Sequence, residues 1–366
     1  MNTETSSLSN ADKMRKSLFL NGWLVTQIIS SIFRIVLTLT IAFLMGAIVI
    51  WVSGKDPVQA YGALIQSSLG SRTAIANSLL AATPILFTAM AAAIAFRAGV
   101  FNVGVEGSLY LGAFAAAWVG FTFTNLPGWM LIPLCLLAAA LVGGVWCFIP
   151  GLLKSRLGVD ELVTTILLNY VAILFTEYLV NGPFLVPGLA NAMSEQIAPS
   201  ARFVRLMPPS QLNVSFIIAL IAAIMVIYIM NKTTLGYEIR MVGDNPDFAK
   251  WSGINVSSVI EKVMVIGGIL GGLAGAGQVM GVHYRFIAGF SPGLAFTGMT
   301  VALLVRSSPI GALFVALLFG ILRSGGATME LMSDVPRDLI RVLEATLIFF
   351  AAIEFGSLIW RRQRVR

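Results

Sequence analysis

The chain has 366 residues, of which 57% are hydrophobic and 11% are charged, about half the charged share of an average globular domain. This composition and a mean hydropathy of +0.88 exclude an ordinary water-soluble protein and favour helices of about 20 residues that cross a bilayer. Two cysteines and one histidine are too few for a disulfide framework or a Cys/His metal centre, so no metal ligand is predicted.

Apolar spans follow one another along the chain and predict an all-α polytopic membrane protein with about ten transmembrane helices. The spans cover residues 33–52, 74–96, 100–123, 129–150, 161–181, 213–231, 261–282, 296–306, 310–323 and 339–360. Segments 296–306 and 310–323 are too short to cross a full bilayer at 1.5 Å per residue. We therefore expect these two helices to be tilted or partly enclosed by protein.

The basic residues predict the orientation of these spans. The net charge of +7 does not indicate nucleic acid, because most basic residues lie between apolar runs, where the positive-inside rule explains them. A cytosolic N-terminus puts sixteen of the 24 lysines and arginines inside, so both termini are expected in the cytosol. The chain is predicted to consist of a cytoplasmic N-terminal tail and pre-membrane segment at 1–32, a transmembrane domain at 33–360 and a basic cytoplasmic tail at 361–366. Within the transmembrane domain, the loop at 182–212 is expected to be extracytoplasmic and the loop at 232–260 cytoplasmic. The basic tail either binds anionic membrane lipid or only follows the positive-inside rule.

Two irregular segments interrupt the apolar pattern. Residues 98–107 (AGVFNVGVEG) place three glycines, an Asn and a Glu at the edge of a span, and residues 283–299 (HYRFIAGFSPGLAFTGM) form a similar turn before a short helix. Irregular backbone at membrane depth needs protein or a water-filled cavity around it, because lipid cannot satisfy the freed amides. Spans two to five and seven to ten are therefore either inverted repeats with broken or short helices, or alike in composition alone.

Polar and aromatic residues in the apolar spans are candidates for a translocation pathway. Glu106 either faces a cavity or partner, because an uncompensated charge at bilayer depth is costly, or braces the broken helix by pairing with Arg97. Asn102 could offer hydrogen bonds to a polar, uncharged solute, and an aromatic ring could stack on a base or sugar. The other asparagines fit interhelical hydrogen bonds at least as well. The candidates are Asn77, Phe101, Asn102, Glu106 and Asn169.

The cytoplasmic loop carries its own helix signals. An Asn-Pro pair is typical of an N-cap and first helical residue, and a glycine eight residues after the Asn is typical of a stop. The helix between them is too short to fold without a partner, so its aromatic side chains either rest on lipid headgroups or dock another protein. Further on, Ser258 and Glu261 have capping-box spacing and are expected to open the next span. The candidate docking residues are Asn245, Pro246, Asp247, Phe248, Trp251 and Gly253.

This loop also carries a family resemblance. Residues 236–256 (GYEIRMVGDNPDFAKWSGINV) resemble the cytoplasmic loop in permeases of ABC importers, and more closely those of the branched-chain amino acid and simple-sugar permease superfamily. The form FNVGVEG, with the long segment 182–212, looks most like the larger permease subunit of nucleoside importers. Other segments that resemble the same superfamily are 95–107, 151–169, 300–311 and the pair 319–320, which is followed by the pair 335–336.

The resemblance implies a multi-pass permease of the bacterial inner membrane. It would pair with a second homologous permease, bind two cytosolic ABC ATPases through the helix at 246–252, and receive solute from an extracytoplasmic binding protein or lipoprotein. The solute implied is a nucleoside, with a simple sugar as the alternative.

The sequence contains no G-x-x-x-x-G-K-[ST] motif, so ATP and Mg²⁺ are expected on the partner ATPase, and this chain is predicted to bind no cofactor. No nucleophile with a base is recognised either, so no catalytic residue is predicted and the chain is not expected to be an enzyme. A secondary transporter driven by ions is the other class considered. It would need ligands for a coupling ion, and Glu106, Glu177 and Glu344 form no cluster in the sequence.

Overall fold

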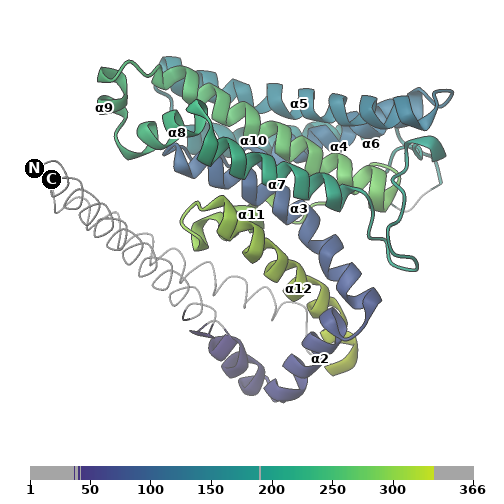
Figure 1. The fold of residues 1–366 in the computed structure, drawn as a ribbon. Helices are drawn as coiled ribbons and strands as arrows, with labels where there is room; N and C mark the ends of the chain where they lie inside the picture. The colour runs from purple at the N-terminus through teal and green to yellow at the C-terminus, as the bar shows by residue number, and fades with distance from the viewer. Residues whose placement is uncertain (1–36, 38–39, 42, 189–190, 334–366) are drawn as a thin grey trace, which may run out of the picture.

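The computed structural model describes residues 37, 40–41, 43–188 and 191–333, and throughout this part of the chain the secondary structure is helical, with isolated β-bridges only. Figure 1 shows α3, α4, α5, α6, α7 and α10 side by side in one bundle, with α2, α11 and α12 beside it and α8 and α9 at one end. The helices are α2 (Pro57–Leu69), α3 (Arg72–Arg97), α4 (Val105–Thr122), α5 (Gly128–Leu157), α6 (Glu161–Asn181), α7 (Ser215–Lys232), α8 (Thr234–Asp244), α9 (Pro246–Trp251), α10 (Val256–Gln278), α11 (Leu294–Leu304) and α12 (Pro309–Ser333).

Six of the described helices are long and apolar enough to cross a membrane, namely α3, α5, α6, α7, α10 with the turn that follows it, and the part of α12 up to Gly326. They confirm a polytopic, all-helical membrane protein, whereas the number of ten spans stays a prediction. Within the first predicted span, residues 43–52 form an apolar helix, and the span at 339–360 lies outside the described residues.

Two helices differ from their predicted bounds, and one helix was not predicted. The span expected at 100–123 begins only at Val105, because the backbone before it is an irregular turn with Gly99 at φ +76°. The segment 310–323 is not a short helix but part of the 25-residue α12. The sequence reading also passed over α2, which begins with an Asp56 N-cap and Pro57 at its first position.

Helix α10 lies at the centre of the bundle, in contact with α3, α4 and α5. Its glycines allow this close packing. A Cβ at Gly272 would collide with the carbonyl of Ala139 in α5, and a Cβ at Gly112 in α4 would collide with Gly272 itself. Small residues at such crossings let helix backbones approach, which is how membrane helices gain dispersion energy without a hydrophobic driving force.

The two irregular segments predicted from the sequence are confirmed. Each precedes a helix that begins inside the bundle, α4 after residues 98–104 and α11 after residues 284–293. The second segment is reached through a π-helical turn, Val279–His283, followed by Tyr284 in the left-handed region at φ +56°. The packing around the two helices is also related, since α10 contacts α4 and α5 while α3 contacts α11 and α12.

The chain between α6 and α7 closes the end of the bundle opposite α9. It contains a short 3-10 helix (Pro199–Ala201) and is bound to the end of α10 by backbone hydrogen bonds. The N–H of Ile197 donates to the carbonyl of Tyr284 at 2.9 Å, and that of Phe203 donates to the carbonyl of Met280 at 2.9 Å. These bonds fix a long irregular segment onto the helix that runs through the bundle.

We expect Gly272→Ala to lower the stability of the folded protein, because the added methyl group has no space against α5 and overpacking costs about 1–3 kcal/mol. Gly62→Ala in α2 is the matched control, since a Cβ there meets nothing within 4 Å and alanine is the better helix former. Thermal stability in detergent, followed by fluorescence-detected size exclusion, compares the two. Equal melting midpoints would contradict the packing argument.

Candidate functional site

The helix α9 presents aromatic side chains to solvent at one end of the bundle. Asn245 is its N-cap, with the side-chain oxygen accepting a hydrogen bond from the N–H of Phe248 at 3.0 Å, and Pro246 is the first helical residue. Ala249 is buried, whereas Phe248 is 56% exposed and Trp251 is 90% exposed. The helix and its cap are therefore confirmed as predicted from the sequence, and the exposed rings are what a docking surface requires.

The end of α9 also follows the sequence prediction. Helical structure stops at Trp251, and Gly253 adopts φ +83°, a conformation that favours glycine. Asp247 lies in the first turn and is exposed. We call Asn245, Pro246, Asp247, Phe248, Trp251 and Gly253 the coupling surface, after the role that the family resemblance implies for them.

The following helix does not begin where the sequence suggested. Asn255, not Ser258, is the N-cap of α10, and its side chain accepts a hydrogen bond from the N–H of Ser258 at 3.1 Å. The predicted capping box is therefore wrong. Glu261 instead reaches α5, where it accepts a hydrogen bond from the Ser155 hydroxyl at 2.7 Å and lies 3.4 Å from the Nε of Arg156.

Helix α8, which the sequence reading missed, connects the coupling surface to the first irregular segment. The Cα of Gly243 lies so close to the carbonyl of Arg97 that a side chain there would collide with it. A Cβ at Gly99 would be 3.5 Å from the Cα of Gly243, and Arg97 lies 4.0 Å from the carboxylate of Asp244. A displacement of α8 would therefore press directly on the end of α3 and the turn before α4.

Glu106 is buried at the first turn of α4, and both of its carboxylate oxygens accept hydrogen bonds from protein groups. Its carboxylate accepts hydrogen bonds from the Ser291 hydroxyl at 2.6 Å and from the backbone N–H of Ala295 at 2.8 Å. Tyr110, one turn along α4, donates its hydroxyl to the Ser291 carbonyl at 2.9 Å. Of the two alternatives for Glu106, the brace is observed, but its partners are Ser291 and Ala295, and Arg97 lies near Asp244 instead. Glu106 braces the start of α11, where a negative charge is favourable at a helix N-terminus.

The two other buried candidates differ in how far their side chains are satisfied by hydrogen bonds. The Asn169 side chain accepts from the Gly107 N–H at 2.8 Å and donates to the Val103 carbonyl at 2.9 Å, so it ties α6 to the turn before α4. Asn102 has no exposed surface, and its side-chain oxygen lies 3.9 Å from the sulfur of Cys147. Its side-chain nitrogen finds no hydrogen-bond partner among the described residues.

The remaining pathway candidates, Phe101 and Asn77, are exposed. Phe101 is 37% exposed and packs against Phe96, with ring centroids 4.9 Å apart. Asn77 is exposed near the start of α3, and its side-chain oxygen accepts a hydrogen bond from Ser210 at 3.0 Å. The structure thus brings Asn102, Glu106 and Asn169 together around the first irregular segment, but it does not bring all five candidates to one cavity.

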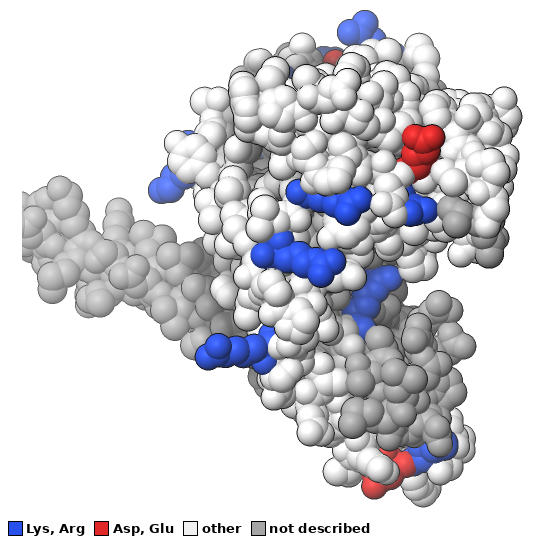
Figure 2. Space-filling model, turned by 90° about the vertical axis from the view of Figure 1, so that its right-hand side faces the viewer, with Lys and Arg blue, Asp and Glu red and all other residues white. Residues whose placement is uncertain are grey.

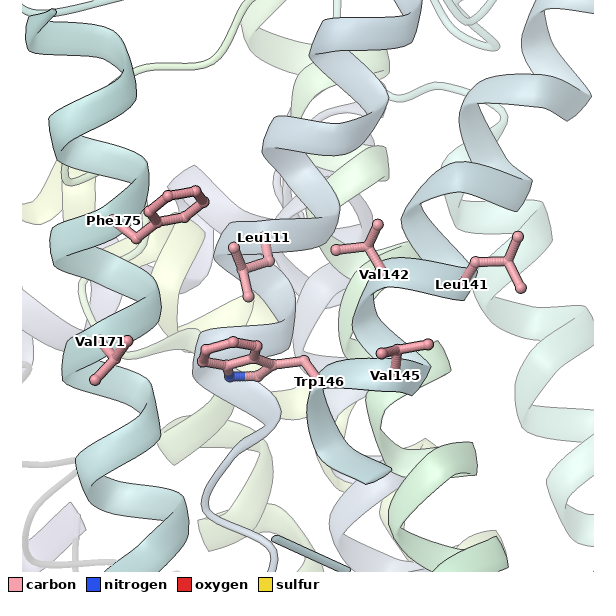
Figure 3. A pocket seen from close by; sticks show the side chains of 7 residues that line it. All are labelled: Leu111, Leu141, Val142, Val145, Trp146, Val171 and Phe175. Atoms are coloured by element: carbon pink, nitrogen blue, oxygen red, sulfur yellow. The ribbon is translucent and has the colours of Figure 1, made fainter. Parts of the chain in front are cut away.

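An apolar cavity of about 460 Å³ lies between α4, α5 and α6 (Figure 3). Hydrocarbon side chains dominate its wall, and the indole N–H of Trp146 is buried without a partner among the described residues. A polar solute would find few hydrogen-bond partners there, so we do not assign it as a solute site. Its lining residues are Leu111, Leu141, Val142, Val145, Trp146, Val171 and Phe175.

No group of three or more His, Cys, Asp or Glu side chains gathers within the described part of the chain, so we assign no metal site. Ser291 and Ala295, the hydrogen-bond partners of Glu106, were not predicted from the sequence. The similarity of the two Gly-rich turns was the one feature of the sequence that could have indicated this contact. A hydrogen bond to a backbone N–H does not depend on which residue supplies the N–H, so the residue type gives no indication of it.

Comparison with known proteins identifies the protein family of this chain. The model of the family described as branched-chain amino acid transport system permease components matches residues 74–352. The chain is 35% identical to the nucleoside ABC transporter permease protein NupB of Lactococcus lactis subsp. cremoris (strain MG1363), a match that covers 87% of this chain and 90% of the relative. It is also 35% identical to the guanosine ABC transporter permease protein NupP of Bacillus subtilis (strain 168), covering 85% and 90%. A glucose ABC transporter permease of Haloferax volcanii is 33% identical, covering 86% and 85%.

The chain therefore belongs to the family of branched-chain amino acid transport system permease components, the transport subunits of ABC systems. The resemblance noted in the sequence is confirmed at the level of the family.

Replacing Glu106 by Ala should lower the thermal midpoint of the protein, because the buried Ser291 hydroxyl and Ala295 N–H would each lose a partner, at roughly 1–3 kcal/mol per unpaired group. Glu106→Gln should cost less, since one acceptor oxygen is kept. Glu177→Ala is the control, because the carboxylate of this partly exposed acid makes no hydrogen bond among the described residues. A Glu106→Ala midpoint equal to that of the control would show that the brace is dispensable.

Proposed function

We propose that this chain is the membrane-spanning subunit of an ATP-driven importer that moves nucleosides without changing them chemically. The observation that carries the proposal is the 35% identity, over nearly the whole chain, to two permeases named for nucleosides and for guanosine. A nucleoside is polar but uncharged, so its passage needs hydrogen-bonding groups and aromatic faces rather than a buried counter-ion.

In this proposal the coupling surface seats in a groove of a cytosolic ABC ATPase. The exposed rings of Phe248 and Trp251 would be the anchors, because aromatic side chains in a fully desolvated pocket carry much of the energy at protein interfaces. Movement of the ATPase would pass through α9 to α8 and then, at the Gly243–Arg97 contact, to the irregular segment before α4. ATP and Mg²⁺ would bind to the ATPase and not to this chain.

The proposal includes a second homologous permease and an extracytoplasmic binding protein or lipoprotein that delivers the solute. The end of the bundle that carries α9 would face the cytosol, with both termini on that side, and the chain between α6 and α7 would face outward across a bacterial inner membrane. The paired packing of α10 on α4 and α5, and of α3 on α11 and α12, supports two inverted repeats.

A simple-sugar importer is the second candidate, and the glucose permease relative at 33% identity favours it. The two solutes share hydroxyl groups, and they differ in the aromatic base of the nucleoside.

Uptake of labelled guanosine and uridine should fall to background in cells that lack this chain and return when it is supplied on a plasmid. Uptake of labelled glucose and ribose in the same cells is the comparison. A loss of sugar uptake with unchanged nucleoside uptake would refute the nucleoside assignment and favour the second candidate.

The double variant Phe248→Ala with Trp251→Ala should reduce copurification of the ATPase and solute-stimulated ATP hydrolysis in proteoliposomes by at least about tenfold. Truncation at an interface hot spot costs about 2–4 kcal/mol, and tenfold corresponds to about 1.4 kcal/mol. Ala249→Pro should be as severe, because it removes the N–H that donates to Asn245 at 3.0 Å. Expression and insertion should stay near the wild-type level, because the helix lies outside the apolar spans.

Trp129→Ala is the matched control for the coupling surface. Trp129 is 77% exposed at the start of α5, away from α9, so its loss should leave ATPase copurification unchanged. Wild-type copurification by the double variant would mean that Phe248 and Trp251 are only headgroup anchors.

A further inference from the structure

An arginine interrupts the apolar stretch of α12. Arg323 lies about 21 Å along the helix axis from Pro309, at 1.5 Å per residue, which is well inside a hydrocarbon core of about 30 Å. A cation at this depth is costly unless protein or water surrounds it, and such residues commonly mark solute pathways. Arg323 is therefore a candidate for function and not only for packing.

The side of α12 that carries Arg323 faces α3. Phe319 and Gly320 lie one turn earlier on the same side of the helix. Phe319 is 1% exposed, and a Cβ at Gly320 would collide with the Ser78 carbonyl in α3. Figure 2 shows the molecule with the bundle above and α2 and α12 below, and basic side chains lie where these two parts meet. The partly exposed Arg323 thus continues the protein-facing stripe of α12 and is not turned to lipid.

The charge of Arg323 is balanced, but its hydrogen-bond donors are unused. Its positive charge interacts with the carboxylate of Glu106, and both oxygens of that carboxylate already accept hydrogen bonds from Ser291 and Ala295. The guanidinium itself makes no hydrogen bond or ion pair within the described part of the chain. Its nitrogens are not among the enclosed polar atoms that lack a partner, so a solute can reach them. Free donors with a balanced charge suit a polar solute that carries no net charge.

We propose that Arg323 contacts the solute and selects a 6-oxopurine base such as guanine, an inference that rests on the proposed function. A guanidinium donates two parallel hydrogen bonds to O6 and N7 of guanine. Adenine has a donor amino group in place of O6, so one of the two bonds is lost and two donors face each other. One of the relatives of this chain is a permease named for guanosine.

The test measures uptake of labelled guanosine and adenosine, each well below half-saturation, in cells whose only copy of this chain is wild type or variant. Arg323→Gln should lower the ratio of guanosine to adenosine uptake about tenfold, because a glutamine amide matches N6 and N7 of adenine. Uridine is a second reference, since its ring lacks the O6–N7 pair, and the ratio of guanosine to uridine uptake should fall as well.

Arg323→Lys separates recognition from charge balance. It keeps the positive charge near Glu106, so the thermal midpoint in detergent should stay at the wild-type value. The ratio of guanosine to adenosine uptake should still fall several-fold, because an ammonium group cannot make two parallel hydrogen bonds in one plane. Arg72→Gln is the matched control, because this exposed arginine at the start of α3 lies outside the interior, and it should leave both ratios unchanged.

Unchanged ratios in both Arg323 variants would overturn the inference. It would also be overturned if Arg323→Gln lowered the uptake of all solutes equally and Arg323→Lys restored it, since Arg323 would then only balance the charge of Glu106. Either result with guanosine uptake intact in the wild type leaves the proposed function standing. Absence of both guanosine and uridine uptake in the wild type would instead refute the proposed function itself.

Discussion

The buried carboxylate of Glu106 is the constraint on which the arrangement of the irregular segments depends. A charge at this depth must be satisfied by protein, and here the Ser291 hydroxyl and the Ala295 N–H satisfy it. The start of α11 is thereby fixed to the first turn of α4, and Asn169 fixes the turn before α4 from the other side. Two helices can begin inside an apolar bundle because side chains replace the water that their free amides would otherwise need.

The same arrangement places packed helices between the two ends of the molecule. The coupling surface is joined through α8 to the turn before α4, and it is also followed within a few residues by α10. At its far end α10 becomes a π-helical turn bonded to the chain between α6 and α7. The glycine contacts of α10 with α4 and α5 make this helix a closely packed element.

Much of the fold was predictable because its signals are local. An apolar run of about 20 residues marks a membrane helix whatever its neighbours are, and α3, α5, α6, α7 and α10 lie close to their predicted spans. The cap of α9 was equally local, since an Asn-Pro pair specifies its own turn. One error arose where two local patterns competed. Ser258 and Glu261 had capping-box spacing, but Asn255 capped the helix first and Glu261 bonded to α5.

The sequence by itself therefore determined the membrane class, most helix positions, the exposed aromatic helix and the family. Only the tertiary structure decided which polar groups meet. Glu106 and its partners are 185 and 189 positions apart, and one of those partners is a backbone N–H, which any residue except proline supplies. The contact between Gly243 and Arg97 and the gathering of Arg202 and Arg205 around Tyr284 depend in the same way on helix packing, because residues distant in the chain become neighbours only when the bundle forms.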